Sequence, residues 1–349
     1  MATKGYHSYS GRRNNTKKIV LVVILVLILL AAVAFLLMQR YIVYDDDGGI
    51  RLELPLHKQH SDKPDPLPQV DEDTIQREEP SDVPDPEPEM KPAPAVEELH
   101  AVELPHDCLS GDPSGLLEGQ SAVVVNLKRY DGSLTYQSSI ALPETVLQGD
   151  SDTLANLSRI TESDCYTVAR ISSLCDNAFS LGQPESAMRY SDGSLWYDNY
   201  SRNWLDPSQT GAREYLCNLA AECQKLGFDE LLLDHFRYPI EGDLGVTTLD
   251  PGTDRGAVLA QLADKIRETA PSMHLSIILP ASIGTDYSFA ASGLPAEVLM
   301  EHFDRIYVPR ESSAYYWLDS VLDSDYDRQT KLVITDYAPV AGSSYLVIQ

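Results

Sequence analysis

The amino-acid sequence predicts an α/β protein, a (β/α)8 TIM-like barrel preceded by a single N-terminal transmembrane helix and a disordered Pro/acidic linker. Three observations lead to this prediction. Eight short apolar runs alternate with helical segments over about 250 residues, the usual size of one such barrel. An unbroken apolar run of 20 residues lies near the N-terminus. Between the two is a stretch in which proline alternates with charge.

The apolar run, residues 19–38, is long enough to cross the ~30 Å hydrocarbon core of a bilayer as a helix. Residues 1–18 are basic and contain no acidic residue, whereas three aspartates follow Arg40. The positive-inside rule therefore places residues 1–18 in the cytoplasm and the C-terminal domain outside the cell, as a single-pass protein of the cell membrane. The alternative is a cleaved signal peptide, because Ala32-Val33-Ala34 has the form of a cleavage site. The apolar residues that follow this site favour the anchor.

Residues 39–98 are predicted to form an extracellular linker. Positions 45 to 103 contain 18 acidic and 5 basic residues, and proline alternates with charge in segments such as 84–88. Prolines favour extended geometry and like charges repel, so this composition indicates a stiff spacer. The net charge of −26, without a basic patch, argues against nucleic acid as a partner.

The barrel is predicted to occupy residues 99–349. Its eight strands are expected at Ala101–Leu104, Ala122–Leu127, Tyr166–Ile171, Glu230–Asp234, Leu275–Leu279, Arg305–Val308, Leu332–Thr335 and Tyr345–Ile348. The first and last runs are weak, which leaves a seven-strand barrel open. Helices are expected over 211–226, ending at Gly227, and over 258–270, ending before Pro271.

The cysteines do not predict a metal site. None of the five forms a CxxC pair, so a zinc site is unsupported, and neither a metal nor a cofactor is expected. One disulfide is possible, and at least one thiol must stay free because the number is odd.

Asp234 is the leading candidate for a catalytic residue. It ends an apolar run that begins after Gly227 and is followed by a basic and aromatic segment up to Pro239. Barrels of this kind carry their active sites at the carboxyl ends of the strands. Because side chains alternate along a strand, an inward Asp234 would put Glu230 near the floor of the barrel, in a structural role.

Several segments together resemble a known family. They are Ala122–Lys128 with the turn 131–136, Tyr166–Ile171, Trp204–Pro207 with its helix, and the run that carries Asp234, Arg237 and Pro239. In order and spacing they are similar to the glycoside-hydrolase-like barrels of bacterial surface proteins, a domain family of unknown function related in fold to the α-amylases. The resemblance spans about residues 120 to 240.

The resemblance implies roles for two carboxylates. In α-amylase-like barrels the fourth-strand Asp is the nucleophile and a fifth-strand acid protonates the leaving group, so Asp234 matches the nucleophile. Asp336, at the end of the seventh strand, matches a transition-state carboxylate. The chain departs from the family at Asn126, where Asp is usual, and at Leu232, where Gln is usual. Its fifth strand, 275–280, has no acidic residue.

Cleavage of a glycosidic bond generally requires two carboxyl groups. Asp336, Glu241 and Asp286 are candidates for the second, and Asp336 ranks first because a strand end is a rigid support. Arg170 and Arg237 could hold Asp234 ionised. A purely structural Arg170–Asp234 ion pair is the alternative.

Other side chains are expected to contact substrate. Lys128 and His235 could bind hydroxyl groups, although each could equally be a solvated group at the rim. Aromatic residues near the mouth could stack on sugar rings, and packing of the loop onto the barrel explains them as well. These aromatics are Trp196, Tyr197, Tyr200, Trp204, Tyr238 and Tyr307.

The sequence therefore predicts a membrane-anchored, extracellular glycoside-hydrolase-like protein that hydrolyses a polysaccharide or cell-wall glycan by carboxylate catalysis. Whether it is an active enzyme stays open. The missing fifth-strand acid favours an alternative, a degenerate barrel that binds glycan without cleaving it. A surface scaffold is the third possibility.

Overall fold

A computed structural model describes residues 42–44, 50–52, 98–322 and 325–349. It divides into two units. In the first, strand β1 (Ile42–Tyr44) pairs antiparallel with β2 (Ile50–Leu52). The predicted transmembrane helix 19–38 and most of the linker lie outside the described residues. Among the helices that are described, none is both long and apolar enough to span a bilayer.

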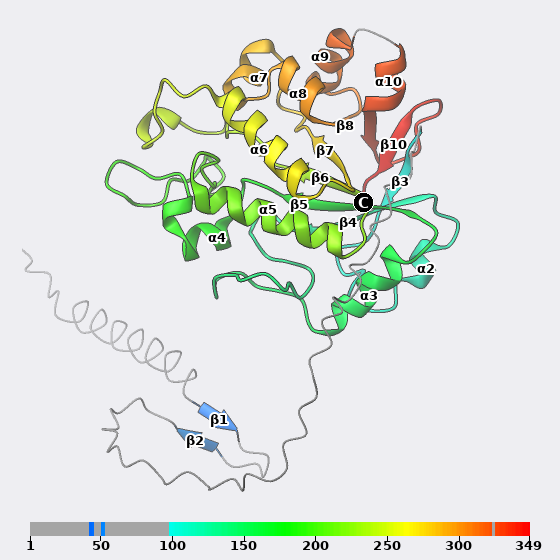
Figure 1. The fold of residues 1–349 in the computed structure, drawn as a ribbon, viewed down its shortest axis with the longest axis horizontal. Coiled ribbons are helices and arrows are strands. Elements are labelled where there is room, and N and C mark those ends of the chain that lie inside the picture. Colours follow the sequence, from blue (N-terminus) through cyan, green and yellow to red (C-terminus); the bar gives the residue numbers. More distant parts are fainter. Residues whose placement is uncertain (1–41, 45–49, 53–97, 323–324) are drawn as a thin grey trace, which may run out of the picture. The chain divides into compact units, whose positions relative to one another are not determined.

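The second unit is a closed barrel of eight parallel strands (Figure 1). The strands are β3 (His100–Glu103), β4 (Ala122–Lys128), β5 (Tyr166–Ser172), β6 (Glu230–Asp234), β7 (His274–Ile278), β8 (Arg305–Pro309), β9 (Leu332–Asp336) and β10 (Ser344–Val347). Each boundary lies within one residue of its predicted position. The two weak strands are both present, and they pair with each other to close the barrel. The seven-strand alternative is therefore wrong.

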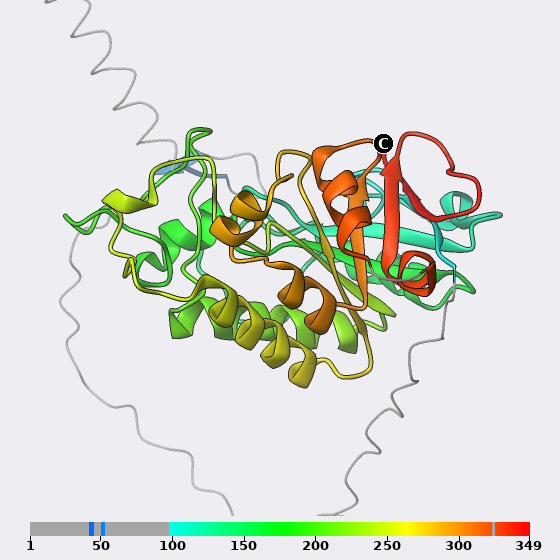
Figure 2. The ribbon, with the colours of Figure 1, turned by 90° about the horizontal axis from the view of Figure 1, so that it is seen from above.

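Helices connect successive strands as far as β9. They are α2 (Ser114–Leu117), α3 (Asp152–Thr161), α4 (Asn177–Gly182), η1 (Pro184–Ser186), α5 (Thr210–Lys225), η2 (Leu244–Val246), α6 (Arg255–Thr269), α7 (Asp286–Ser292), α8 (Ala296–His302), α9 (Ser313–Val321) and α10 (Asp325–Lys331). Helices α5, α6 and α8 lie side by side outside the barrel (Figures 1 and 2). Residues 337–343 return from β9 to β10 without a helix.

Strand alternation divides the apolar residues into two cores. One fills the barrel and includes Val124, Val168, Leu232 and Val333. The other, larger core lies between the outer faces of the strands and the helices. On β6 the inward residues are therefore Glu230, Leu232 and Asp234.

Glu230 is fully buried and serves a structural role, as predicted. It pairs with Arg305 and accepts hydrogen bonds from the hydroxyls of Tyr166 (3.0 Å) and Tyr307 (2.7 Å). A buried carboxylate requires such partners, because its desolvation would otherwise be too costly. This network closes the amino-terminal end of the barrel interior.

All five cysteines are free thiols, so the possible disulfide does not form. Burial raises the pKa of Cys108 to about 11 and that of Cys175 to about 12. These two thiols are therefore protonated at neutral pH and behave as small apolar residues.

Candidate functional site

The carboxyl ends of the strands carry a group of charged side chains that point into the mouth of the barrel. Asp234 ends β6, Arg170 lies on the inner face of β5, and Glu103 ends β3. The three side chains are joined by two ion pairs, and each keeps a small exposed fraction of 8–21%. This cluster is the candidate site.

Asp234 is held as a carboxylate. Its Oδ2 accepts a hydrogen bond from Arg170 Nη2 at 2.6 Å, and its Oδ1 lies 3.1 Å from His235 Nδ1. The backbone N–H of His235 also donates to Oδ1, at 2.7 Å. Burial alone would raise the pKa of Asp234, but His235 and Arg170 together hold this pKa well below its usual range. Asp234 can therefore accept hydrogen bonds or act as a nucleophile, but it is not a proton donor at neutral pH.

His235 is a partner of Asp234 and not a free rim group. Its backbone has a φ of +52°, in the left-handed region that a non-glycine residue seldom adopts. Its Nδ1 lies 3.2 Å from Ser172 Oγ, and its ring meets the Trp204 indole edge-on, with 5.8 Å between ring centroids. These contacts fix the imidazole beside the carboxylate.

Glu103 is a second carboxylate near Asp234, and no sequence motif predicts its role. Its Oε1 accepts a hydrogen bond from Arg170 Nη1 at 2.8 Å. Because both carboxylates contact nitrogens of one planar guanidinium, their nearest oxygens can be no more than about 8 Å apart. Its position one residue before the end of the predicted strand Ala101–Leu104 was the only available signal.

Asp336 is not part of this cluster. On β9, Val333 faces the barrel interior and Ile334 faces the outer core, so alternation places Asp336 on the outer face. There it accepts a hydrogen bond from Arg310 Nη1 at 3.0 Å. The expectation that Asp336 is the second catalytic carboxylate does not agree with this geometry, since Thr335 occupies the inward position.

The other two candidates for the second acid are also engaged elsewhere. Glu241 receives a bidentate contact from Arg237, with N–O distances of 2.8 and 3.0 Å. Asp286 starts α7 and accepts a hydrogen bond from Trp317 Nε1 at 2.6 Å. On β7, the inward residue nearest the mouth is the apolar Ile278. Among the described residues, every carboxyl group with a shifted pKa is shifted downward, so none of these shifts creates a proton donor.

Two expected site cations are structural. Arg237 is 3% exposed and pairs with Glu241, not with Asp234. Lys128 is also buried. Its Nζ lies 2.8 Å from Asp176 Oδ2 and donates to the carbonyl of Ser172. Neither side chain is available to a substrate hydroxyl, because each is buried and already held in an ion pair.

The aromatic residues fall into two groups. Trp196 is 2% exposed and Tyr238 fully buried, as are Trp204 and Tyr307, so all four pack the fold and do not form sugar platforms. Exposed tyrosines instead follow the carboxyl ends of several strands: Tyr130, Tyr197, Tyr200, Tyr287, Tyr316 and Tyr337. In a parallel barrel these segments begin at the same rim as Asp234.

The described residues contain no group of three His, Cys, Asp or Glu side chains placed to hold a metal ion.

Part of the chain matches a known protein family. Residues 118–285 match the family model described as "Putative glycosyl hydrolase domain". The matched region carries β4 to β7, with Arg170 and Asp234, whereas Glu103 lies outside it. No curated protein matches the chain significantly.

Solved structures give weaker likenesses. A hypothetical protein from Ruminiclostridium thermocellum is 24% identical, with a TM-score of 0.44, over 50% of this chain and 96% of that one. The glycoside hydrolase domain of PelA from Pseudomonas aeruginosa is 16% identical, with a TM-score of 0.43, over 69% and 84%. Alpha-L-fucosidase isoenzyme 2 from Paenibacillus thiaminolyticus is 12% identical, with a TM-score of 0.48, over 72% of this chain and 46% of the fucosidase. Such values carry no conclusion about activity.

Proposed function

We propose, on the premise that residues 118–285 belong to this glycosyl hydrolase domain family, that the barrel is a glycan-binding protein whose site is its carboxyl-terminal mouth. One observation carries the proposal. Asp234 is held ionised at the mouth by Arg170 and His235, while the neighbouring strand β7 offers no carboxyl group to protonate a leaving group. An ionised carboxylate accepts hydrogen bonds from sugar hydroxyls without needing a proton donor.

Charge and aromatic residues support a glycan that is uncharged or positively charged. Residues 98–349 contain 37 acidic and 16 basic residues, which disfavours a polyanion. The exposed tyrosines that follow the strand ends combine an apolar ring with a polar hydroxyl. Such rings can cover the apolar face of a sugar while the hydroxyl keeps its contact with water.

The test is a glycan-array screen with the full chain, followed by an assay of reducing-sugar release from every glycan that binds. Binding without release supports the proposal. Release that disappears in the Asp234→Asn variant would show that the barrel is an active glycosidase. No binding to any glycan would reject a glycan-binding role.

A second candidate function is hydrolysis with Glu103 as the second carboxyl group. The shared contact with Arg170 favours it, because a separation of at most about 8 Å overlaps the ~5–9.5 Å range found in glycosidases. The carboxyl group that protonates the leaving group would then come from β3 and not from β7.

Hydrolysis through Glu103 makes a specific prediction. Glu103→Gln is expected to lower glycan release by about 100-fold or more while glycan binding changes by less than about threefold, because general acid–base catalysis contributes about 10²–10⁴ to a rate. Glu118→Gln, which alters an exposed carboxylate beyond β3, is the matched control. Equal release from both variants would eliminate Glu103 as a catalytic group.

The N-terminal region is proposed to anchor the protein, with the barrel outside the cell. The 20-residue apolar run and the basic residues before it support this location. The full chain is expected to stay in the membrane fraction after an alkaline wash, and deletion of residues 1–38 is expected to release it. A mature N-terminus that begins after Ala34 would instead establish a cleaved signal peptide.

A further inference from the structure

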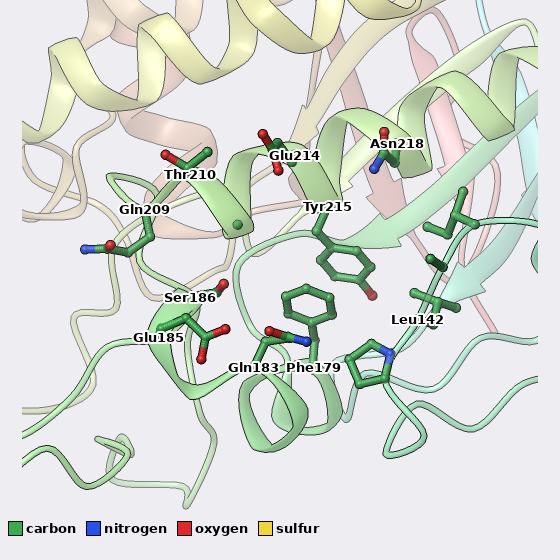
Figure 3. Close-up of a pocket in the computed structure, with 14 residues that line it drawn as sticks. Leu142, Phe179, Gln183, Glu185, Ser186, Gln209, Thr210, Glu214, Tyr215 and Asn218 are labelled. Atoms are coloured by element: carbon green, nitrogen blue, oxygen red, sulfur yellow. The ribbon is translucent and has the colours of Figure 1, made fainter.

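We infer that a pocket beside the start of α5 is a second ligand site, separate from the mouth, and that it takes a neutral, hydroxyl-rich ligand such as a sugar unit or short oligosaccharide. The pocket has a volume of about 560 Å³, within the ~300–1,000 Å³ typical of small-molecule sites. Residues of α4, η1, α5 and the segment 140–143 line it (Figure 3). The family match and the mouth cluster do not assign this site.

The floor of the pocket is aromatic and rigid. Phe179 from α4 and Tyr215 from α5 are stacked, with ring centroids 3.8 Å apart and an interplanar angle of 6°. Both are buried, and the Tyr215 hydroxyl lies 3.3 Å from Asp176 Oδ2. Leu142 and Pro143 extend the apolar wall. Because the two rings are buried and stacked on each other, they fix the shape of the floor and do not offer a free face for stacking.

Hydrogen-bond donors line one side of the pocket. Helix α5 begins at Thr210 without a side-chain cap, so the N–H groups of its first turn have no partner within the helix. The side-chain amides of Gln183 and Asn218 add further donors.

Ser186 offers a hydroxyl group to the pocket. The residue lines the pocket, is only 3% exposed, and its hydroxyl makes no hydrogen bond with any other described residue. Its Oγ is so close to the start of α5 that a Cβ added to Gly211 would lie 2.3 Å from it. A pocket-lining hydroxyl without a protein partner is free to donate to, or accept from, a hydroxyl group of a ligand.

Charge selects the class of ligand. Glu185 and Glu214 line the pocket as acceptors, and no lining residue is basic. The two carboxylates repel an anion, and a simple cation leaves the backbone N–H groups unused. A hydroxyl group both donates and accepts hydrogen bonds. A neutral polyol therefore satisfies both the N–H donors and the carboxylate acceptors of the pocket.

The experiment is a titration of the full chain with maltotriose, cellotriose and chitotriose, followed by saturation-transfer NMR and calorimetry. At least one trisaccharide is expected to bind, and Glu214→Gln is expected to weaken that binding about tenfold, because it replaces a charged acceptor. Glu268→Gln, an exposed carboxylate on α6, is the matched control and should leave the affinity unchanged.

A further variant separates this site from the mouth. Asp234→Asn should leave the pocket binding unchanged, so a trisaccharide that depends on Glu214 but not on Asp234 supports the inference even if the mouth binds nothing. The inference is overturned if no trisaccharide binds. It is equally overturned if every binding event is insensitive to Glu214→Gln.

Discussion

Replacing Lys128 with methionine is expected to destabilise the barrel by about 3–5 kcal/mol, the usual cost of removing one partner from a buried ion pair. Lys128 Nζ lies 2.8 Å from Asp176 Oδ2, and both side chains are fully buried. Without the ammonium group, the Asp176 side chain keeps, among the residues that the structure describes, its contacts with Phe179 N–H (2.8 Å) and Tyr215 (3.3 Å). The loss is measured by urea denaturation followed by tryptophan fluorescence.

Two further variants test the cause of this loss. Lys225→Met removes an exposed lysine at the end of α5 and should change the free energy of unfolding by less than about 0.5 kcal/mol. The double variant Lys128→Met with Asp176→Asn should be more stable than Lys128→Met alone, because it removes the unpaired charge. A double variant that loses as much as the sum of the two single variants would contradict the ion-pair explanation.

Asp234→Asn is expected to weaken glycan binding at the mouth about 10- to 100-fold, because a hydrogen bond to a charged group contributes about 1.5–3 kcal/mol. The change also removes the negative partner of Arg170, which is then left with Glu103 alone. Asp336→Asn is the matched control, since Asp336 lies on the outer face of β9. If Asp336→Asn weakened binding as much as Asp234→Asn, the site would have to include the outer face of β9.

The same variant has a predictable pH dependence. The pKa of Asp234 is held below the value of about 3.9 expected in the unfolded chain, so its ion pairs stabilise the fold fully above about pH 4. This stabilisation is lost as the pH falls through the folded-state pKa. The difference in free energy of unfolding between the wild type and Asp234→Asn should therefore shrink as the pH falls below about 4.

The strands were predictable to within one residue because apolar runs bounded by Gly, Pro and polar residues mark each of them. Which side chains face inward was not predictable, since strands buried on both faces show no alternation. The sequence of β9, Leu-Val-Ile-Thr-Asp, is apolar up to its last two residues, so nothing in it indicated that Asp336 faces outward.

The burial of Lys128 could not be predicted either, for a different reason. The pairing of β4 with β5 shifts register between Asn126 and Lys128, at the residue that forms the buried ion pair with Asp176. A bulge of this kind has no signature in the residue types. In contrast, Asp234 and Arg170 were identified correctly as neighbours, because both lie near the carboxyl ends of adjacent strands.

The pairing of β3 with β10 has a consequence for the order in which the barrel can form. These neighbours are separated by about 240 residues of chain, and their contacts include a stack of His100 on Tyr345 with 4.6 Å between ring centroids. Until residues 344–347 have been synthesised, β3 and β9 remain edge strands with unpaired backbone groups, which are templates for aggregation. The barrel can therefore close only after β10 has been synthesised, and until then both edges are open to pairing with other chains.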